Sequence, residues 1–321
     1  MFIRAVHFGS CLILQSVFVL LILAMIPSWK ESRGGNAPER DQFHRVLHRL
    51  VVVCLLAALV SGFLWLWFAI ASMSGSGLLE SLHPSLFWMV LTQTQPGRVW
   101  LLRAAIAIVF TFSLCFVFGN RRAGNATWLP IPLCAVSVTA LTASLAWLGH
   151  AGASEGPNQD LHLAGDLVHL ISAGIWPAGL APFAIFLRCS LKAQDPSSLL
   201  AACVATRRFS TLSFLTVGVL LASGAVNAYF LVGAFHALTS TDYGLLLVLK
   251  IMLSGIAIGF GAWNLLAFKP RLTIAEGSLP DDTQSAALAK VARNVWVELC
   301  FVSLVLLVIG LLGIMPPAAH S

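Results

Sequence analysis

Long apolar runs separated by short polar segments repeat along the whole chain. A helix needs about 20 apolar residues to cross the hydrocarbon core of a membrane, and eight of the runs reach that length. They predict transmembrane spans, numbered 1 to 8 in chain order, at residues 6–28, 46–72, 99–118, 128–149, 163–187, 209–233, 243–267 and 294–314. The pattern therefore predicts an all-α, polytopic membrane protein embedded in a lipid bilayer.

The composition agrees with this prediction, because 58% of the 321 residues are hydrophobic and only 10% are charged. A soluble domain has roughly 45–50% apolar and about 25% charged residues. The net charge of +6 does not indicate nucleic-acid binding, since the basic residues form short clusters between apolar runs. The sequence also has no phosphate-binding loop and no G-x-S-x-G or H-E-x-x-H string, so any chemistry would depend on a metal or a haem.

Lysine and arginine are divided unequally between the two sides of the membrane. Of the 19 such residues, fifteen follow spans 1, 3, 5 and 7, whereas Arg4, Arg98, Arg103 and Lys250 fall on the other side or in its spans. Positive residues accumulate in cytoplasmic loops. Both termini are therefore predicted to lie outside the cytoplasm, which in a bacterial cell is the periplasm.

Two pairs of short strings recur at the same offset of 162 residues. The string that contains His7 in span 1, Val-His-Phe-Gly-Ser, matches the one that contains His169 in span 5, Val-His-Leu-Ile-Ser. The string Leu-Val-Ser-Gly that ends at Gly62 matches Leu-Ala-Ser-Gly that ends at Gly224. Two matches in the same order indicate an internal duplication.

A third match joins the segments that end at Arg103 in span 3 and at Lys250 in span 7. The chain is therefore predicted to consist of two four-helix halves, residues 1–150 and 151–321. Four spans are an even number, so the halves should be parallel repeats about an axis along the membrane normal.

Histidines and acidic residues gather on the side that is predicted to be periplasmic. They are His7, His83, His150, His162, His169, His236 and His320, with Glu80, Glu155, Asp160, Asp166 and Asp242. A surface with imidazoles, carboxylates and few cations suits a metal cation. Ordinary polar loop residues are the alternative interpretation, and it carries most weight for His83, His236 and His320.

Span 5 contains the densest group of candidate ligands. His162, Asp166 and His169 are spaced i, i+4 and i+7, so on a helix they share one face. A carboxylate between two imidazoles can be a third metal ligand, or it can fix the tautomer of a histidine. Pro177 is predicted to kink the same span.

Span 1 contains a second candidate pair, because His7 and Cys11 are four residues apart and offer nitrogen and sulfur ligands that suit copper. Simple packing is the alternative for Cys11. The duplication predicts that His7 and His169 lie at matching depth and form one shared site.

Ionisable groups inside a span are costly unless they are paired or hydrated. Arg103 and Lys250 are such groups, and Asp166 is the expected partner of one of them, with a purely structural ion pair as the alternative. Glu298 and Asn264, near the inner ends of spans 8 and 7, are expected to bond each other or a basic loop.

These strings together resemble the copper resistance protein D (CopD) family of bacterial inner-membrane proteins. The resemblance rests on Arg4-Ala-Val-His7-Phe8, Gly149-His150-Ala151, Leu161-His162 through Asp166 to His169-Leu170 with Trp176, Arg208-Phe-Ser210, Ser223-Gly-Ala-Val-Asn227-Ala228, Thr241-Asp-Tyr243-Gly244 through Lys250, and Val297-Glu298. One departure is Trp-Pro-Ala-Gly-Leu at residues 176–180, where the family usually has W-x-G-G-L.

The resemblance implies copper tolerance and copper transport across the inner membrane, with a small periplasmic copper-binding protein as partner. On this hypothesis His150, His162 and His83 capture the copper ion at the outer face. His169 with Asp166, and His7 with Cys11, then carry it into the bundle. No catalytic residue is predicted.

The main alternative is a b-type haem oxidoreductase that reduces copper or exchanges electrons with quinone. His7 and His169 would then be the axial ligands, and Arg103 and Lys250 would lie near the haem propionates. A third hypothesis is a non-catalytic assembly partner of a copper chaperone.

Overall fold

A computed structural model describes residues 2–32, 37–122, 130–154, 156, 158–275 and 278–320. Every regular element in these ranges is a helix. Eight helices are long and apolar enough to cross a membrane: Phe2–Glu31, Arg40–Ser74, Gln95–Phe118, Pro130–Leu148, Gln159–Ala193, Pro196–Val232, Asp242–Leu272 and Asp282–Leu312. The predicted all-α fold with eight spans is confirmed.

Several spans consist of more than one helical segment. In chain order the α-helices are α1 (Phe2–Leu20), α2 (Ile26–Glu31), α3 (Ala37–Ser74), α4 (Pro84–Gln93), α5 (Gln95–Arg122), α6 (Pro130–Ala143), α7 (Gln159–Ile175), α8 (Leu180–Ala193), α9 (Pro196–Val232), α10 (Ala237–Ser240), α11 (Asp242–Trp263) and α12 (Asp282–Leu312). The shorter helical turns are η1 (Leu21–Met25), η2 (Glu80–Leu82), η3 (Ser144–Leu148), η4 (Ala151–Ala153), η5 (Asn264–Phe268), η6 (Lys269–Leu272) and η7 (Ala318–His320).

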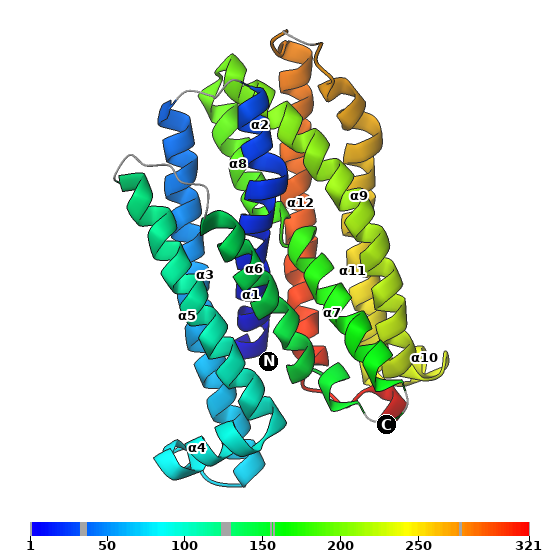
Figure 1. The fold of residues 1–321 in the computed structure, drawn as a ribbon. Helices are drawn as coiled ribbons and strands as arrows, with labels where there is room; N and C mark the ends of the chain where they lie inside the picture. Colours follow the sequence, from blue (N-terminus) through cyan, green and yellow to red (C-terminus); the bar gives the residue numbers. More distant parts are fainter. Residues whose placement is uncertain are drawn as a thin grey trace.

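Both termini lie at the same end of the bundle (Figure 1), which we call the terminal end. Helix α1 starts there and runs through the centre of the molecule, where it packs against α3, α6, α7, α8 and α12. The short helices α4 and α10 lie on opposite sides of the terminal end (Figure 1). Neither short helix was predicted from the sequence.

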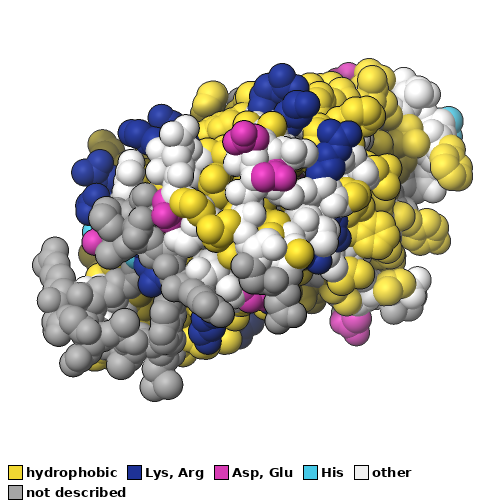
Figure 2. Space-filling view, turned by 90° about the horizontal axis from the view of Figure 1, so that it is seen from above, with side chains coloured by type: hydrophobic (Ala, Val, Ile, Leu, Met, Phe, Trp, Pro, Cys, Tyr) yellow, Lys and Arg dark blue, Asp and Glu magenta, His cyan; other side chains and the backbone are white. Residues whose placement is uncertain are grey.

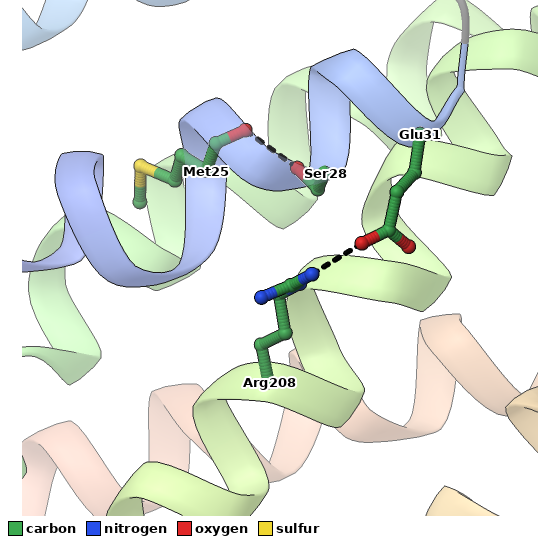
Figure 3. A network of polar contacts seen from close by, with 4 residues as sticks. All are labelled: Met25, Ser28, Glu31 and Arg208. Atoms are coloured by element: carbon green, nitrogen blue, oxygen red, sulfur yellow. Dashed lines mark hydrogen bonds and ion pairs between the residues drawn. The ribbon is translucent and has the colours of Figure 1, made fainter.

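The other end of the bundle, which we call the opposite end, carries clusters of lysine and arginine side chains (Figure 2). Arg208 on α9 forms an ion pair with Glu31 on α2 at this end (Figure 3). Both side chains are largely exposed, so the pair contributes at most about 1 kcal/mol. Arg33 and Glu155, and the side chains of Arg121, Arg122 and His320, lie outside the described part of the chain.

Three of the described spans are interrupted close to prolines. In span 1 the π-helical turn η1 lies just before Pro27, the second residue of α2. The predicted kink at Pro177 is confirmed as a break, because α7 ends at Ile175 and α8 begins at Leu180. In span 7, α11 passes into the π-helical turn η5, which begins at Asn264, shortly before Pro270. Single π-helical turns of this kind often occur at functional sites.

The segments that precede spans 3 and 7 fold in the same way. The hydroxyl of Thr94 bonds the carbonyl of Val90 at 2.8 Å, and the hydroxyl of Thr241 bonds the carbonyl of Ala237 at 2.7 Å. Each threonine also accepts a 3.0 Å bond from the backbone N–H of a glycine three residues later. Any larger residue at either glycine would place its Cβ 2.1 Å from a carbonyl oxygen. The similar strings therefore encode the same tight joint between a short helix and a long one.

Candidate functional site

The imidazole of His7 is buried between three helices. Its Nδ1 lies 3.0 Å from the carbonyl oxygen of Ala58 and 3.1 Å from the hydroxyl of Ser61, both on α3. Its Nε2 lies 2.6 Å from a guanidinium nitrogen of Arg103 on α5. Because a carbonyl can only accept and arginine can only donate, Nδ1 carries the hydrogen of His7 and Nε2 is the acceptor.

Arg103 fills the space on the far side of His7. It is only 2% exposed, and it also donates to the carbonyl of Leu141 at 2.7 Å and to the hydroxyl of Ser144 at 2.6 Å. The Sγ atom of Cys11 lies 3.9 Å from His7 Nε2 and 3.7 Å from Arg103. The predicted His7–Cys11 pair is therefore brought together, but a cation occupies the position between the two ligands.

His169 on α7 repeats the first half of this arrangement. Its Nδ1 lies 3.2 Å from the carbonyl oxygen of Leu220 and 3.2 Å from the hydroxyl of Ser223 on α9. The sequence separations, 51 and 54 residues, are identical to those between His7 and its two partners on α3. In each half a histidine thus donates to a carbonyl and contacts a serine on the next span.

A glycine makes room for each of these rings. A Cβ atom on Gly62 would lie 2.9 Å from Cε1 of His7, and a Cβ atom on Gly224 would lie 3.2 Å from Cε1 of His169. The Ser-Gly pairs that match in the sequence are therefore the cradles of the two imidazoles. The sequence contained this signal, because the histidines and the Ser-Gly pairs recur at one offset.

The two halves differ at the second ring nitrogen. Nε2 of His169 has no hydrogen-bond partner within the described ranges, whereas Nε2 of His7 is bonded to Arg103. Lys250, the sequence counterpart of Arg103, is close enough to interact electrostatically with both His169 and Asp166. The Nδ1–H of His169 is thus held by a carbonyl, and no described residue bonds its Nε2.

The halves also differ in the side chains that lie one helical turn before each histidine, toward the terminal end. Asp166 accepts a 3.1 Å hydrogen bond from the side-chain amide of Asn227, which lies 61 residues later. The equivalent pair in the first half is Arg4 and Trp65, where the guanidinium stacks 4.6 Å from the centre of the indole ring. A carboxylate in the second half therefore replaces a cation in the first.

His162 lies in the first turn of α7, close to His150, whose ring Nε2 is 3.4 Å from the carbonyl oxygen of Leu312. Nδ1 of His162 lies 2.6 Å from the hydroxyl of Ser154, and that hydroxyl donates to the carbonyl of His150. The ring of His162 stacks on Phe230, with 4.7 Å between ring centres. The Ser154 hydroxyl has one hydrogen, so it either donates to Nδ1 of His162 or donates to His150 and accepts from the Nδ1–H of His162.

One predicted ligand, His83, stands apart from this group. His83 is exposed beside η2 and α4, where its Nδ1 contacts the hydroxyl of Ser85 at 2.9 Å. His7 and His169 share no direct hydrogen bond or ring contact with each other. In the part of the chain that the structure describes, no three His, Cys, Asp or Glu side chains are arranged to hold one metal ion.

Sequence analysis missed Gln15, a fully buried residue of α1 that binds α7. Its amide donates to the carbonyl of Ile171 at 3.0 Å, and it fits only because residue 174 is glycine. A Cβ atom at Gly174 would lie 2.1 Å from the oxygen of Gln15. This contact holds the central helices of the two halves together.

Comparisons with known proteins point to one family. The family model described as "Copper resistance protein D-like, N-terminal domain" matches residues 1–160, and the model "Copper resistance protein D" matches residues 204–312. Copper resistance protein D of Pseudomonas syringae pv. tomato is 30% identical over 234 residues, which cover 73% of this chain and 72% of that protein. No solved structure matches the chain.

Two further relatives are similar over different lengths. Copper transport protein CutJ of Bacillus subtilis (strain 168) is 30% identical over 201 residues, or 62% of this chain and 36% of that protein. Inner membrane protein YebZ of Escherichia coli (strain K12) is 27% identical over 270 residues, or 84% of each chain.

Fold and site together define a multi-pass α-helical membrane protein with buried histidines in both halves. The chain belongs to the copper resistance protein D family. This membership supports a role in copper handling at the inner membrane.

The two imidazoles differ in how far they can move, because only His7 is bonded at its second ring nitrogen, and this difference can be measured. We expect Gly62→Ala to lower the unfolding temperature in detergent more than Gly224→Ala, with a cost of about 1–3 kcal/mol for an overpacked site. His7 is held from its far side by Arg103 and cannot move away from a new methyl group, whereas His169 can shift. Gly255→Ala is the control, because its Cβ meets no atom within 4 Å. Equal losses at positions 62 and 224 would contradict the asymmetry.

Proposed function

We propose that the protein binds copper at the terminal end and moves it inward across the bacterial inner membrane, in copper homeostasis or resistance. The observation that carries this proposal is the state of His169. A histidine that ligates a metal almost always donates its other ring hydrogen to a carbonyl, a carboxylate or water. His169 meets this condition, because its Nδ1 is bonded to the carbonyl of Leu220 while its Nε2 is available.

On this proposal the copper ion follows α7. His150 and His162 take it up near the start of the helix, and His169 with Asp166 receives it further in. His162 and His169 are seven residues apart, which corresponds to about 10 Å along a helix. The carboxylate of Asp166 lies between them in sequence and offsets the charge of the neighbouring Lys250.

The first half and the outer loop have smaller parts in this proposal. His7 and Cys11 can bind copper only if Arg103 moves, because its guanidinium contacts both. His83 could only act at an earlier stage of capture, since it is exposed at the edge of the bundle beside α4. We also propose that a periplasmic copper-binding protein delivers the ion to the terminal end.

The residues present do not fit a haem held between His7 and His169. Nε2 of His7, the nitrogen that would ligate the iron, is taken by Arg103. An absorption spectrum of the purified protein is the direct check. A Soret band with about one haem per chain would favour the oxidoreductase alternative, and bound copper without such a band favours copper transport.

The orientation of the protein can be tested with reporter fusions. We expect both termini to be periplasmic and the loops around residues 207–208 and 269–271 to be cytoplasmic, because cations gather at the opposite end of the bundle. Alkaline phosphatase fused after residue 200 or residue 280 should be inactive, and the same enzyme fused near the C-terminus should be active. An active fusion at residue 200 or 280 would contradict this topology.

The copper route predicts different effects for different side chains. His169→Ala should lower the initial rate of copper uptake by cells about tenfold or more, which is the range for losing part of a metal site. Asp166→Asn should also weaken uptake without unfolding the protein, because the amide keeps the volume and can still accept from Asn227. The measurement is copper uptake together with copper bound per purified chain.

Two further variants serve as controls for this experiment. His236→Ala, an exposed histidine outside the proposed route, should behave like the wild type. His7→Ala should lower stability more than copper uptake, because His7 bonds Arg103 rather than presenting a free nitrogen. Unchanged uptake in His169→Ala, or lost stability with normal uptake in Asp166→Asn, would contradict the proposal.

A further inference from the structure

A cavity of about 590 Å³ lies in the second half of the bundle, toward the opposite end. Its walls come from the break between α7 and α8, from α9, from the end of α11 with η5, and from the start of α12. Helix α9 runs obliquely across this half of the molecule (Figure 1). The volume is within the range of about 300–1,000 Å³ that is usual for small-molecule sites.

The mouth of the cavity faces the lipid. Phe214, Leu215 and Leu266 line it, and more than half of the surface of each is exposed on the outside of membrane-spanning helices. A molecule dissolved in the bilayer can therefore reach the cavity without passing through water.

A carboxyl group forms the polar end of the cavity. Glu298 on α12 is only 2% exposed, and its Oε1 accepts a 2.8 Å bond from the amide of Asn264, the first residue of the π-helical turn η5. Asn294 bonds the oxygen of Asn264 at 2.8 Å and fixes its orientation. This agrees with the expected contact between Asn264 and Glu298.

The second oxygen of Glu298 has no such partner. Among the described residues no donor or acceptor bonds Oε2, which lies against Gly261, where an added Cβ atom would be 3.4 Å away. Both residues line the cavity. A second polar atom there, the hydroxyl of Ser213, is buried without a hydrogen bond. A buried polar group without a partner, such as the Ser213 hydroxyl, is costly. This hydroxyl and Oε2 of Glu298 mark where the polar head of a ligand would bind.

The rest of the lining is apolar and rich in rings, with Trp176, Phe183 and Phe209 among its residues. A flat aromatic body fits between such side chains by stacking and edge contacts. A hydroxyl head suits the carboxyl in either protonation state, because a hydroxyl group both donates and accepts. An anionic lipid head would be repelled by an ionised Glu298, and a carbonyl head would suit only a protonated one.

We propose that this cavity binds a membrane-dissolved aromatic alcohol of the quinol type. Its hydroxyl bonds Oε2 of Glu298, its ring lies among the aromatic side chains, and its apolar tail leaves between α9 and α11. No residue of the proposed copper route lines this cavity. A test of quinol binding is therefore independent of a test of copper transport.

The test uses the full-length protein in quinone-free phosphatidylcholine nanodiscs without copper. The probe is 2,3-dimethoxy-5-methyl-6-decyl-1,4-hydroquinone, titrated without oxygen, and binding is followed by quenching of tryptophan fluorescence, since Trp176 lines the cavity. We expect saturation near one molecule per chain. Oxidation of the probe to the quinone, which can only accept hydrogen bonds, should weaken binding at least fivefold in alkaline buffer that keeps Glu298 ionised.

Two variants and a matched control locate the site. Glu298→Gln should weaken binding of the hydroquinone several-fold, and Gly218→Leu should abolish it, because a side chain at Gly218 meets no atom within 4 Å and fills the cavity. Gly255→Leu is the control, an open helical glycine outside the cavity lining, and should bind normally.

Three outcomes would overturn the proposal. Equal affinity for quinone and hydroquinone would show that the hydroxyl is not recognised, and equal competition by oleate would show a general site for acyl chains. Normal binding in Gly218→Leu would place the ligand elsewhere. If the Glu298→Gln variant unfolds, the Gly218→Leu variant and the comparison of quinone with hydroquinone still test the proposal.

Discussion

The hydrogen bond from an imidazole to a helix carbonyl fixes the geometry of both halves of this bundle. In lipid no water satisfies a polar group, so each side chain must find its partners in the protein. His7 and His169 do so on α3 and α9, and each ring needs a serine to contact and a glycine to lie against. The helix that carries the histidine and the next span must therefore approach at one depth and in one register.

Features that depend on apolar length or on local backbone chemistry could be predicted from the sequence. The eight spans follow from the apolar runs, and the break between α7 and α8 follows from Pro177. The contact between Asn264 and Glu298 could be expected because two polar residues at the same depth in lipid attract each other. The described helices continue beyond several of the apolar runs, since helical hydrogen bonding does not stop where the hydrocarbon ends.

Features that depend on the direction of a side chain could not be predicted. The matching strings indicated equivalent positions for His7 and His169, but not that one ring turns toward α3 and the other toward α9. Asp166 was the expected partner of Arg103 or Lys250. It interacts with Lys250, whereas Arg103 binds one carbonyl, a hydroxyl and His7. The cavity was also unpredictable, because it is the space left where α9 crosses the second half.

The surroundings of His7 and His169 differ mainly in the charged side chains beside each ring. Arginine has a planar fork with five donors and can bond several groups at once, whereas lysine is a single point charge. In the first half the fork closes the space beside His7, and Arg4 adds a second cation near the terminal end. In the second half Asp166 stands at the position equivalent to Arg4, and Lys250 leaves Nε2 of His169 unbonded. A cation that enters from the terminal end would meet repulsion in one half and a carboxylate in the other. The same cradle can therefore serve as a structural lock in the first half and as a ligand site in the second.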